Sequence, residues 1–318
     1  MQIYLITGGT GSLGTALTLR LLKEGHKVRT YSRNEHSIEK LQKAVPKEYH
    51  ERLSPIMGAT EDLSRIRRAT RGVDVVVHAA AQKIIDLAEY NPAPAVMTNI
   101  FGTMNVIEAC LDNSVKKAVF ISTDKARSPS TLYGATKLAS ERLWNAANRY
   151  RGSRGGVFCA LAYGNVWGSN GSVIQAWDLQ SQFGVLKVTD PQMTRFHITL
   201  DAAVDLVCRV VNEADPETLW IPRLPAYRVG DLADAFRAVY KLDRPYEVTG
   251  RRLSEKLHEE LITENESPMI AYEDDTHFVL TPNKIHQQGG WSFTSASAKT
   301  RRLSVEELTE EISKWATR

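Results

Sequence analysis

Hydrophobic positions in the first half of the chain alternate between short unbroken runs and helical spacing. The runs suit strands that are buried on both faces, and the segments between them carry apolar residues every three or four positions. The predicted strands are residues 3–6, 27–31, 53–57, 73–77, 118–121 and 157–160. The predicted helices are residues 12–23, 37–44, 92–111 and 132–149. Repeated strand–helix–strand units with short connections predict an α/β fold built on a doubly wound parallel sheet.

The pattern changes after Gly164, where turn-rich segments separate shorter elements such as the predicted helices 201–211 and 230–239. A chain of 318 residues is long for one compact core. We therefore predict a Rossmann-like domain over residues 1–164 and a smaller α/β lobe over 165–318. Some later segments are expected to return to the main sheet.

Composition and charge narrow the class of protein. Hydrophobic residues make up 42% and charged residues 24% of the chain, which is ordinary for a soluble protein, and the net charge of +3 gives no indication of nucleic acid or a membrane surface as partner. The first predicted strand begins too early for a signal peptide, and no apolar run is long enough to span a membrane. Cys110, Cys159 and Cys208 lie in apolar stretches without metal-ligand spacing. We expect free buried thiols, no metal site and a cytoplasmic location.

A glycine-rich turn follows the first predicted strand and opens the first predicted helix. Gly8, Gly11 and Gly14 permit a tight turn and a close approach of the backbone to a pyrophosphate, whose charge the helix N-terminus stabilises. The strand–turn–helix context makes this a prediction of dinucleotide binding. The residues expected to hold the pyrophosphate are Thr7, Gly8, Gly11, Ser12, Leu13 and Gly14.

The end of the second predicted strand indicates which dinucleotide binds. Ser32 and Arg33 stand where an acidic residue would accept a hydrogen bond from the ribose 2′-hydroxyl of NAD. The Arg33 guanidinium can instead pair with the 2′-phosphate of NADP. We therefore predict NADP rather than NAD, with Glu35 an ordinary residue of the next helix. Asp62 either binds the adenine amino group or caps the helix that begins at Leu63.

A tyrosine and a lysine four residues apart begin the last helix of the first domain. The spacing puts Tyr133 and Lys137 on one face, where the lysine is expected to lower the pKa of the tyrosine so that it can exchange a proton with a substrate hydroxyl. Upstream, the sequence Ser122-Thr123-Asp124-Lys125 follows a strand end, which is where open α/β sheets place their active sites.

Short motifs along the whole chain carry a resemblance to a known family. They are residues 78–81, 87–92, 122–126, 163–166, 171–173, 193–196 and 255–261. With them, the chain resembles an extended short-chain dehydrogenase/reductase, and more narrowly the polysaccharide-biosynthesis branch that contains C5-inverting UDP-N-acetylglucosamine 4,6-dehydratases. The last four motifs lie in the second half, so the similarity extends beyond the cofactor-binding fold.

This resemblance implies a lyase reaction in which Tyr133 and Lys137 serve oxidation at C4, while Asp124 and Lys125 serve an elimination. A C4 ketone acidifies the C5 proton, which Lys125, if neutral, could remove, while a protonated Asp124 could donate to the departing C6 hydroxyl. Hydride then returns to C6 and regenerates the cofactor. Reprotonation of C5 from the opposite face inverts it. The division of acid and base is a hypothesis, and its alternative is that the pair forms a surface salt bridge.

Further contacts follow from the same resemblance. The expected additional cofactor contacts are Ala79, Ala80, Ala81, Lys83 and Asn99, beside Tyr133 and Lys137. The expected substrate contacts are Lys83, Thr123, Asn165, Ser172, Val173, Thr194, Arg195, Arg252 and Glu255. Arg195 and Arg252 suit a diphosphate because each guanidinium is a planar fork. Asn165 suits a phosphate or sugar oxygen, and Glu255 suits ribose hydroxyls.

Three segments depart from the family pattern. Ala162 stands where the family has arginine, and residues 252–256 read Arg-Leu-Ser-Glu-Lys in place of Arg-Pro-Gly-Glu-Lys. Residues 82–86 read Gln-Lys-Ile-Ile-Asp in place of Leu-Lys-His-Val-Pro, in a segment that lies beside the sugar in the family. The exact sugar and the configuration at C5 therefore depend on more than the resemblance.

Two other functions remain open at this point. A UDP-sugar 4-epimerase would use Tyr133 and Lys137 with the same cofactor, but it needs no C5 base or C6 acid, so Asp124 and Lys125 speak against it. A non-catalytic NADP-sensing scaffold often loses the tyrosine or the lysine, and both are present here. The resemblance also implies a homo-oligomer.

Overall fold

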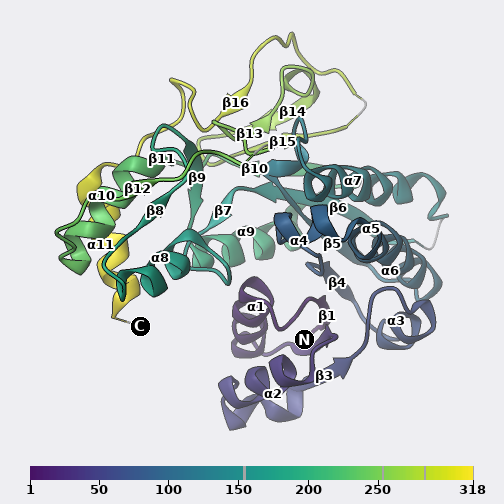
Figure 1. Ribbon diagram of the computed structural model, residues 1–318. Coiled ribbons are helices and arrows are strands. Elements are labelled where there is room, and N and C mark those ends of the chain that lie inside the picture. The colour runs from purple at the N-terminus through teal and green to yellow at the C-terminus, as the bar shows by residue number, and fades with distance from the viewer. Residues whose placement is uncertain (153–154, 253, 283, 318) are drawn as a thin grey trace.

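A large sheet with helices on both faces forms the centre of the protein (Figure 1). The computed structural model describes residues 1–152, 155–252, 254–282 and 284–317, and within them this sheet has nine strands in the order β14-β15-β10-β6-β5-β4-β1-β2-β3. The bounds are β1 (Ile3–Thr7), β2 (Lys27–Ser32), β3 (Leu53–Met57), β4 (Val75–His78), β5 (Lys117–Thr123), β6 (Val157–Tyr163), β10 (Leu219–Pro222), β14 (Ile270–Glu273) and β15 (His277–Leu280).

The run from β3 to β10 is parallel, and β15 and β14 are added in antiparallel orientation at one edge. The order reverses between β1 and β4, so this is the doubly wound arrangement that the hydrophobic pattern predicted. All residues of β4 are buried, as are nearly all residues of β5 and β6, because helices cover both faces of these strands.

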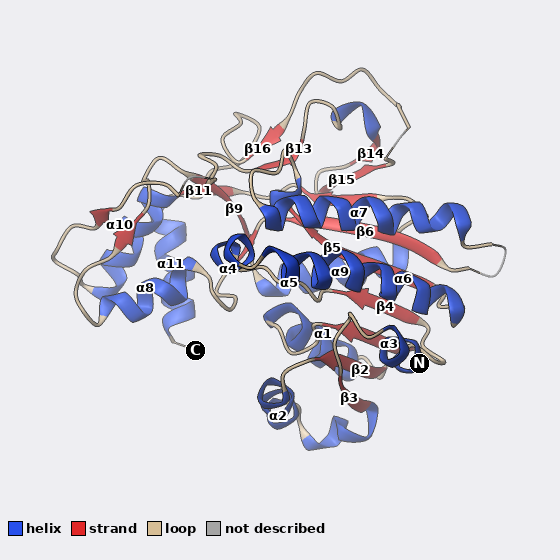
Figure 2. Ribbon diagram, turned by 45° about the vertical axis from the view of Figure 1, so that its right-hand side comes forward, coloured by secondary structure: helices blue, strands red, loops and turns tan. Residues whose placement is uncertain are grey.

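The helices of this layered part follow the predicted segments closely. α1 and α9 contact each other on one face, while α3, α6 and α7 form a row on the other, in front of the strands in Figure 2. The bounds are α1 (Ser12–Lys23), α2 (Glu35–Ala44), η1 (Lys47–Arg52), α3 (Leu63–Ala69), α4 (Ile85–Tyr90), α5 (Pro92–Val96), η2 (Met97–Phe101), α6 (Gly102–Asp112), η3 (Asp124–Ala126), α7 (Leu132–Tyr150) and α9 (Leu200–Glu213).

One predicted helix differs from the structure. Residues 92–111 were expected as one regular helix, but they form α5, a π-helical turn η2 and α6 in succession. Asn99 lies in the π turn, and its carbonyl accepts hydrogen bonds from the hydroxyls of Thr103 and Ser140. Its side chain bonds both backbone groups of Gln82 and the hydroxyl of Thr136. The π turn thus serves tertiary contacts, which hydrophobic spacing does not reveal.

A smaller group of elements lies beside the sheet, at the left in Figure 1. Its own core is formed by buried side chains such as Trp177, Phe236 and Leu308. The remaining elements of the second half are β7 (Asn165–Val166), α8 (Val173–Ser181), β8 (Lys187–Val188), β9 (Thr194–Ile198), β11 (Ala226–Arg228), α10 (Val229–Tyr240), β12 (Glu247–Val248), β13 (Glu260–Ile262), η4 (Ser267–Met269), β16 (Phe293–Thr294) and α11 (Val305–Ala316). Of the second half, β10, β14 and β15 belong to the main sheet.

Among the described residues, no helix combines the length and the apolar character needed to cross a membrane.

Candidate active site

A cavity of about 900 Å³ opens at the carboxyl ends of the parallel strands and extends to the smaller lobe. Its walls include the glycine turn after β1, the end of β2, the segments after β4 and β5, the start of α7 and residues of the second half. Open α/β sheets bind ligands at this edge, where the strand order reverses. Tyr133, Lys137, Lys125 and Arg195 all line this one cavity.

The glycine turn forms a close-fitting cradle. Gly8 has a φ of +68°, and a Cβ atom there would lie 2.9 Å from the backbone nitrogen of Ala80. A Cβ atom on Gly14 would lie only 2.4 Å from the Gly8 carbonyl oxygen. Gly11 is the N-cap of α1 and makes no side-chain cap, so the N–H groups of the first turn face the cavity without a capping side chain among the described residues. Such an arrangement suits a phosphate group.

The other predicted cradle residues have structural contacts as well. The Thr7 hydroxyl lies 2.6 Å from His78 Nδ1 and accepts a hydrogen bond from the backbone N–H of Ala80. Ser12 Oγ accepts from the backbone N–H of Asn170, and Lys83 Nζ donates to the carbonyl of the same residue at 2.7 Å. These bonds hold the turn around Asn170 beside the cradle. The predicted residues that line the cavity here are Gly8, Gly11, Ser12, Leu13, Gly14, Ala79, Ala80, Ala81 and Lys83.

The end of β2 presents the predicted cation. Arg33 lines the cavity and keeps about half of its side chain exposed, with Nη1 3.5 Å from a carboxylate oxygen of Glu61. Ser32 accepts hydrogen bonds from the backbone N–H and the hydroxyl of Thr10, so it ties the glycine turn to β2. Glu35 is the first residue of α2. The sequence prediction did not include Glu61, whose carboxylate partly neutralises the positive charge of Arg33.

Two predicted cofactor contacts have other partners in the structure. Asp62 is the N-cap of α3, where its side chain accepts from the backbone N–H of Arg65 at 2.9 Å. The sequence allowed Asp62 either to bind the adenine amino group or to cap this helix, and the structure displays the helix cap. Asn99 is buried beneath the segment after β4 and bonds Gln82 and Thr136, as described above. Neither side chain is among those that line the cavity.

Tyr133 and Lys137 lie in the first two turns of α7, and both line the cavity. Burial lowers the pKa of Lys137 to about 7, and its Nζ donates to the Ile121 carbonyl at 2.6 Å and lies 3.8 Å from the centre of the Phe120 ring. Burial raises the pKa of Tyr133 to about 12, although the nearby Lys125 opposes this. The expected lowering of the Tyr133 pKa by Lys137 is therefore wrong, because burial raises this pKa more than the positive charge of Lys125 lowers it.

Asp124 and Lys125 form an ion pair at the cavity wall rather than a surface salt bridge. Lys125 lines the cavity, whereas Asp124 is fully buried and is not among the lining residues. The turn η3 places both residues directly after β5, and Lys125 Nζ lies 3.1 Å from Asp124 Oδ1. The side chain of Asp124 has no exposed surface, and its Oδ1 also accepts from the Thr123 hydroxyl. Burial raises the pKa of Asp124 above its ordinary value, and the charge of Lys125 only partly offsets this.

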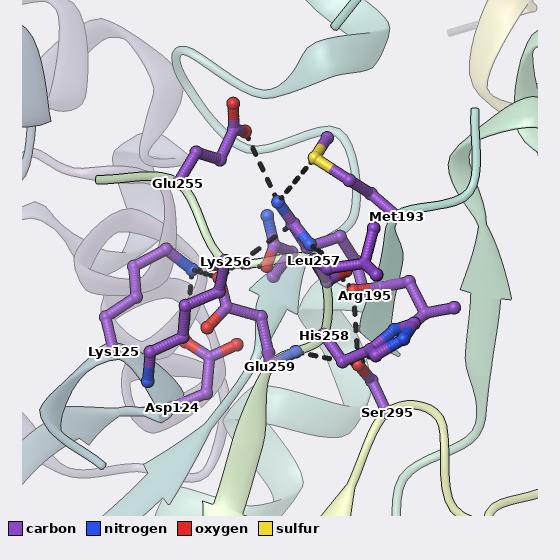
Figure 3. Close-up of polar contacts among 12 residues, drawn as sticks. Asp124, Lys125, Met193, Arg195, Glu255, Lys256, Leu257, His258, Glu259 and Ser295 are labelled. Carbon is purple, nitrogen blue, oxygen red and sulfur yellow. Dashed lines mark hydrogen bonds and ion pairs between the residues drawn. The ribbon is translucent and has the colours of Figure 1, made fainter. Parts of the chain in front are cut away.

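Lys125 has a second acidic neighbour. Its Nζ lies 3.4 Å from a carboxylate oxygen of Glu259 (Figure 3). The side-chain oxygen of Asn165 lies 3.5 Å from the same nitrogen. Burial alone would lower the pKa of Lys125, but Asp124 and Glu259 together raise it above its ordinary value. This shift favours the ammonium form of Lys125, whereas a role as base requires the neutral form.

The predicted substrate residues of the second half divide into two groups. Arg195 is buried in the cavity wall, with Nη2 3.3 Å from Glu255 and Nε 3.8 Å from Glu259. Arg252 lies at the rim, largely exposed and 3.5 Å from Asp86. Leu253 lies outside the described residues. The predicted substrate residues that line the cavity are Lys83, Thr123, Asn165, Ser172, Val173, Arg195, Arg252 and Glu255.

Thr194 does not reach the cavity. Its hydroxyl lies 2.8 Å from His258 Nδ1 and 2.7 Å from the hydroxyl of Ser295, so it joins β9 to the segment before β13. Its expected contact with substrate is replaced by a supporting role, because the side chains of a strand alternate between two sides and Arg195 takes the side facing the cavity.

Glu259 is the main residue of the cavity that the sequence prediction missed. It lies in the 255–261 motif, where Glu255 was chosen because of its expected place near the ribose. The signal for Glu259 was the acidic pair Glu259 and Glu260 directly before Leu261 and Ile262 of β13, which are both fully buried. Only the structure brings this carboxylate to Lys125.

The comparisons with known proteins agree with this geometry. The model of the family described as "Polysaccharide biosynthesis protein" matches residues 4–280. The chain belongs to this family. The resemblance found in the sequence is therefore confirmed at the level of the family.

Individual relatives are similar over most of their length. The chain is 39% identical to "UDP-N-acetylglucosamine 4,6-dehydratase (inverting)" of Campylobacter jejuni over 286 residues, which are 88% of this chain and 82% of the relative. It is 35% identical to "UDP-glucose 4-epimerase" of Rickettsia rickettsii over 332 residues, covering 97% of this chain and 94% of the relative. The X-ray structure of Pen from Bacillus thuringiensis superposes with a TM-score of 0.92 at 34% identity and covers 98% of both chains.

Proposed function

We propose that this protein of the polysaccharide-biosynthesis family is a UDP-N-acetylglucosamine 4,6-dehydratase that inverts C5 and recycles NADP. One observation carries the proposal: Lys125, which pairs with the buried Asp124, lines the same cavity as Tyr133, Lys137 and the glycine cradle. An epimerase needs the tyrosine and the lysine alone, whereas an elimination needs two further proton-transfer groups. The 39% identity to the Campylobacter jejuni dehydratase supports the same reaction.

The residues present fit a dinucleotide. Gly8 and Gly14 stand where a Cβ atom would clash with the backbone, and no side chain of the described residues caps the first turn of α1, whose N–H groups would bind a pyrophosphate. Arg33 would hold the 2′-phosphate that distinguishes NADP from NAD. When bound, the oxidised nicotinamide supplies the hydride acceptor and a positive charge that favours the Tyr133 phenolate.

Tyr133 and Lys137 would carry the step at C4. The Tyr133 oxygen takes the proton of the C4 hydroxyl as C4 is oxidised to a ketone. Lys137 has a pKa of about 7, so it can lose or gain a proton near neutral pH while staying hydrogen-bonded to the Ile121 carbonyl. The lysine therefore suits a proton-relay partner better than a fixed charge.

Asp124 would donate a proton to the departing C6 hydroxyl. Burial raises its pKa and so favours the protonated carboxyl group that such an acid requires. The C4 ketone acidifies the C5 proton, which passes to solvent, while the C6 hydroxyl leaves as water with the proton from Asp124. The result is an unsaturated ketone. Hydride addition at C6 and proton addition at C5 then complete the product without net use of cofactor.

Basic residues and a helix start would hold the UDP group. Arg195 and Arg252 offer planar forks to the diphosphate, and Ser172 and Val173 form the start of α8 at the cavity wall. Asn165 and Thr123 would contact the sugar near Lys125. Asp86, absent from the family pattern, pairs with Arg252 and is expected to influence which sugar is accepted.

Incubation with UDP-N-acetylglucosamine and analysis by mass spectrometry test this function. The proposal predicts a product lighter by one water. An isomer of unchanged mass would identify a UDP-sugar 4-epimerase, the function of the Rickettsia rickettsii relative that is 35% identical. Absence of turnover with the NADP-loaded protein would favour the non-catalytic scaffold.

We also propose that the enzyme acts in the cytoplasm as a homo-oligomer. Three thiols that are buried or half-buried suit a reducing compartment. Light scattering on the purified protein gives the oligomeric state, and a monomer mass would contradict that part of the proposal.

A further inference from the structure

Glu259 is a buried carboxylate in the cavity wall, and the proposed reaction assigns it no role. It lies directly before β13, and its side chain is only 5% exposed. Its Oε1 atom lies 3.4 Å from Lys125 Nζ and 3.8 Å from Arg195 Nε. The backbone N–H of Glu259 donates to Ser295 Oγ at 2.9 Å, which fixes the position of the residue (Figure 3).

Lys125 consequently lies between two carboxylates that come from distant parts of the chain. Asp124 Oδ1 is 3.1 Å from its Nζ atom, and Glu259 Oε1 is 3.4 Å from it. Glu259 Oε2 is buried and has no hydrogen-bond partner among the described residues. A carboxylate is costly to bury unless it serves a nearby cation, and two cations are within reach here.

We propose that Glu259 is a positioning residue that holds Lys125 as an ammonium group in the cavity, so that Lys125 donates the proton to C5 and does not act as the base. This inference rests on the proposed dehydratase function. It reverses the role expected from the sequence, which required a neutral lysine. Asp124 alone cannot secure the ammonium form, because it must itself carry a proton to act as the acid toward C6.

The step is a single proton transfer. Hydride addition at C6 of the unsaturated ketone leaves an enolate, whose electron pair forms a new bond between C5 and a proton of Lys125 Nζ. The N–H bond breaks, its electron pair stays on nitrogen, and the neutral amine regains a proton from water before the next turnover. Glu259 remains ionised throughout and touches no reacting atom.

The charges around Lys125 agree with this role. The titratable and charged groups that face it or its partners are Asp124, Tyr133, Arg195, Tyr227, Lys256 and Glu259. Burial tends to raise the pKa of Glu259, but Lys125, Arg195 and Lys256 together lower it below its ordinary value. Glu259 is thus an anion at neutral pH, and removal of its charge must lower the pKa of Lys125.

The substitution Glu259→Gln tests the inference through the pH dependence of kcat. A proton donor is lost as the pH rises through its pKa, so the alkaline limb of the wild-type profile reports Asp124 and Lys125 together, and Glu259 raises the pKa of both. In the residual activity of the Asp124→Asn background, the limb reports Lys125 alone. We expect this limb to move to lower pH by about one to two units in the variant, as loss of a charge at this distance implies. At pH 7 the KM for UDP-N-acetylglucosamine should change by less than about threefold, because the substitution leaves the residues that bind the UDP group in place.

Two variants provide controls for this profile. Glu260→Gln changes the next residue, which accepts a hydrogen bond from Ser128 outside the cavity, and it should leave the profile and the KM unchanged. Glu259→Asp keeps the charge but withdraws it by one methylene group, so the limb should move in the same direction by a smaller amount. If Glu259→Gln does not fold, as judged by thermal unfolding, the aspartate variant carries the test alone.

The outcomes separate this inference from the proposed function. A wild-type enzyme that forms no dehydrated product would overturn both. A wild-type dehydratase whose alkaline limb stays in place in Glu259→Gln, or in Glu259→Asp where that variant carries the test, would overturn the role of Glu259 alone. A variant with increased kcat at neutral pH would also overturn it, because that result requires Lys125 to work as a neutral base.

Discussion

At the scale of single residues, the cavity is defined by what burial does to ionisable groups. Asp124 and Tyr133 have raised pKa values, and Lys137 has a lowered one, because burial disfavours the charged form of each. Lys125 is the exception, because its acidic neighbours Asp124 and Glu259 more than compensate for its burial, and Glu259 keeps its charge when Asp124 carries a proton. These opposed shifts favour a protonated acid at Asp124 and an ammonium group at Lys125, as the reaction requires.

Replacement of either proton-transfer residue should stop the elimination while the fold and the cofactor site remain. Asp124→Asn cannot donate an acidic proton, and Lys125→Ala removes the ammonium, so each should lower the rate of dehydrated product formation by about 100-fold or more. The measurement is product formation by mass spectrometry, with NADP binding as the control. Full dehydratase activity in either variant would remove that residue from the mechanism.

Arg33 should determine the cofactor preference. Arg33→Ser removes the guanidinium expected at the 2′-phosphate, and we expect affinity for NADP to fall by about 10-fold, with the affinity for NAD nearly unchanged. The effect is moderate because the side chain is half exposed and Glu61 already pairs with it. Calorimetric titration of cofactor-free protein checks both affinities, and an equal loss for both cofactors would argue against a 2′-phosphate contact.

At the scale of elements, the strand–turn–helix unit of β1 and α1 is where local sequence decides most. Its glycine turn, the bounds of α1 and the position of the strand could all be predicted, because these depend on neighbours along the chain. The π turn η2 and the short helix α4 could not, since the former follows from hydrogen bonds to Gln82 and Thr136. Asp62 shows the same limit of local sequence. The sequence allowed it either to cap α3 or to bind adenine, and only the structure displays the cap.

Gly8→Ala should damage cofactor binding beyond its effect on stability. The residue has a φ of +68°, and the added Cβ would lie 2.9 Å from Ala80 nitrogen, so the cradle must open. We expect NADP affinity to fall by at least about 10-fold. Gly72 is a matched control, because it has a φ of +67° and a Cβ atom there meets nothing within 4 Å.

Gly72→Ala should therefore cost about 1 kcal/mol in the free energy of unfolding and leave NADP affinity unchanged. Denaturant unfolding and cofactor titration give both quantities. Equal NADP affinities for the two variants would show that the clash with Ala80 is unimportant.

At the scale of the whole molecule, a buried ion-pair network ties the segment after β5 to the second half. Arg127 has no exposed side-chain surface, donates to Glu266 at 2.7 Å and also pairs with Glu141 of α7. Glu259 of the second half likewise pairs with Lys125, and it also pairs with Arg195. The sequence predicted the α/β fold and most strands and helices of the first half. It could not pair charges more than 100 residues apart, because no local pattern records such contacts.

Arg127→Met should destabilise the protein strongly. It leaves the carboxylates of Glu141 and Glu266 buried without their main partner, which typically costs about 3–5 kcal/mol. Arg67→Met breaks only the exposed pair with Asp112 and should cost less than about 1 kcal/mol. Denaturant unfolding of both variants makes the comparison, and similar costs would contradict a supporting role for the buried network.

The most direct test of the central claim is the reaction with UDP-N-acetylglucosamine in D₂O, followed by NMR of the product. The account predicts a 4-keto-6-deoxy sugar with one deuterium at C5, inverted configuration at that carbon, and hydride returned to C6 without net consumption of NADP. A product with retained configuration at C5, or with the original hydrogen still at C5, would contradict it.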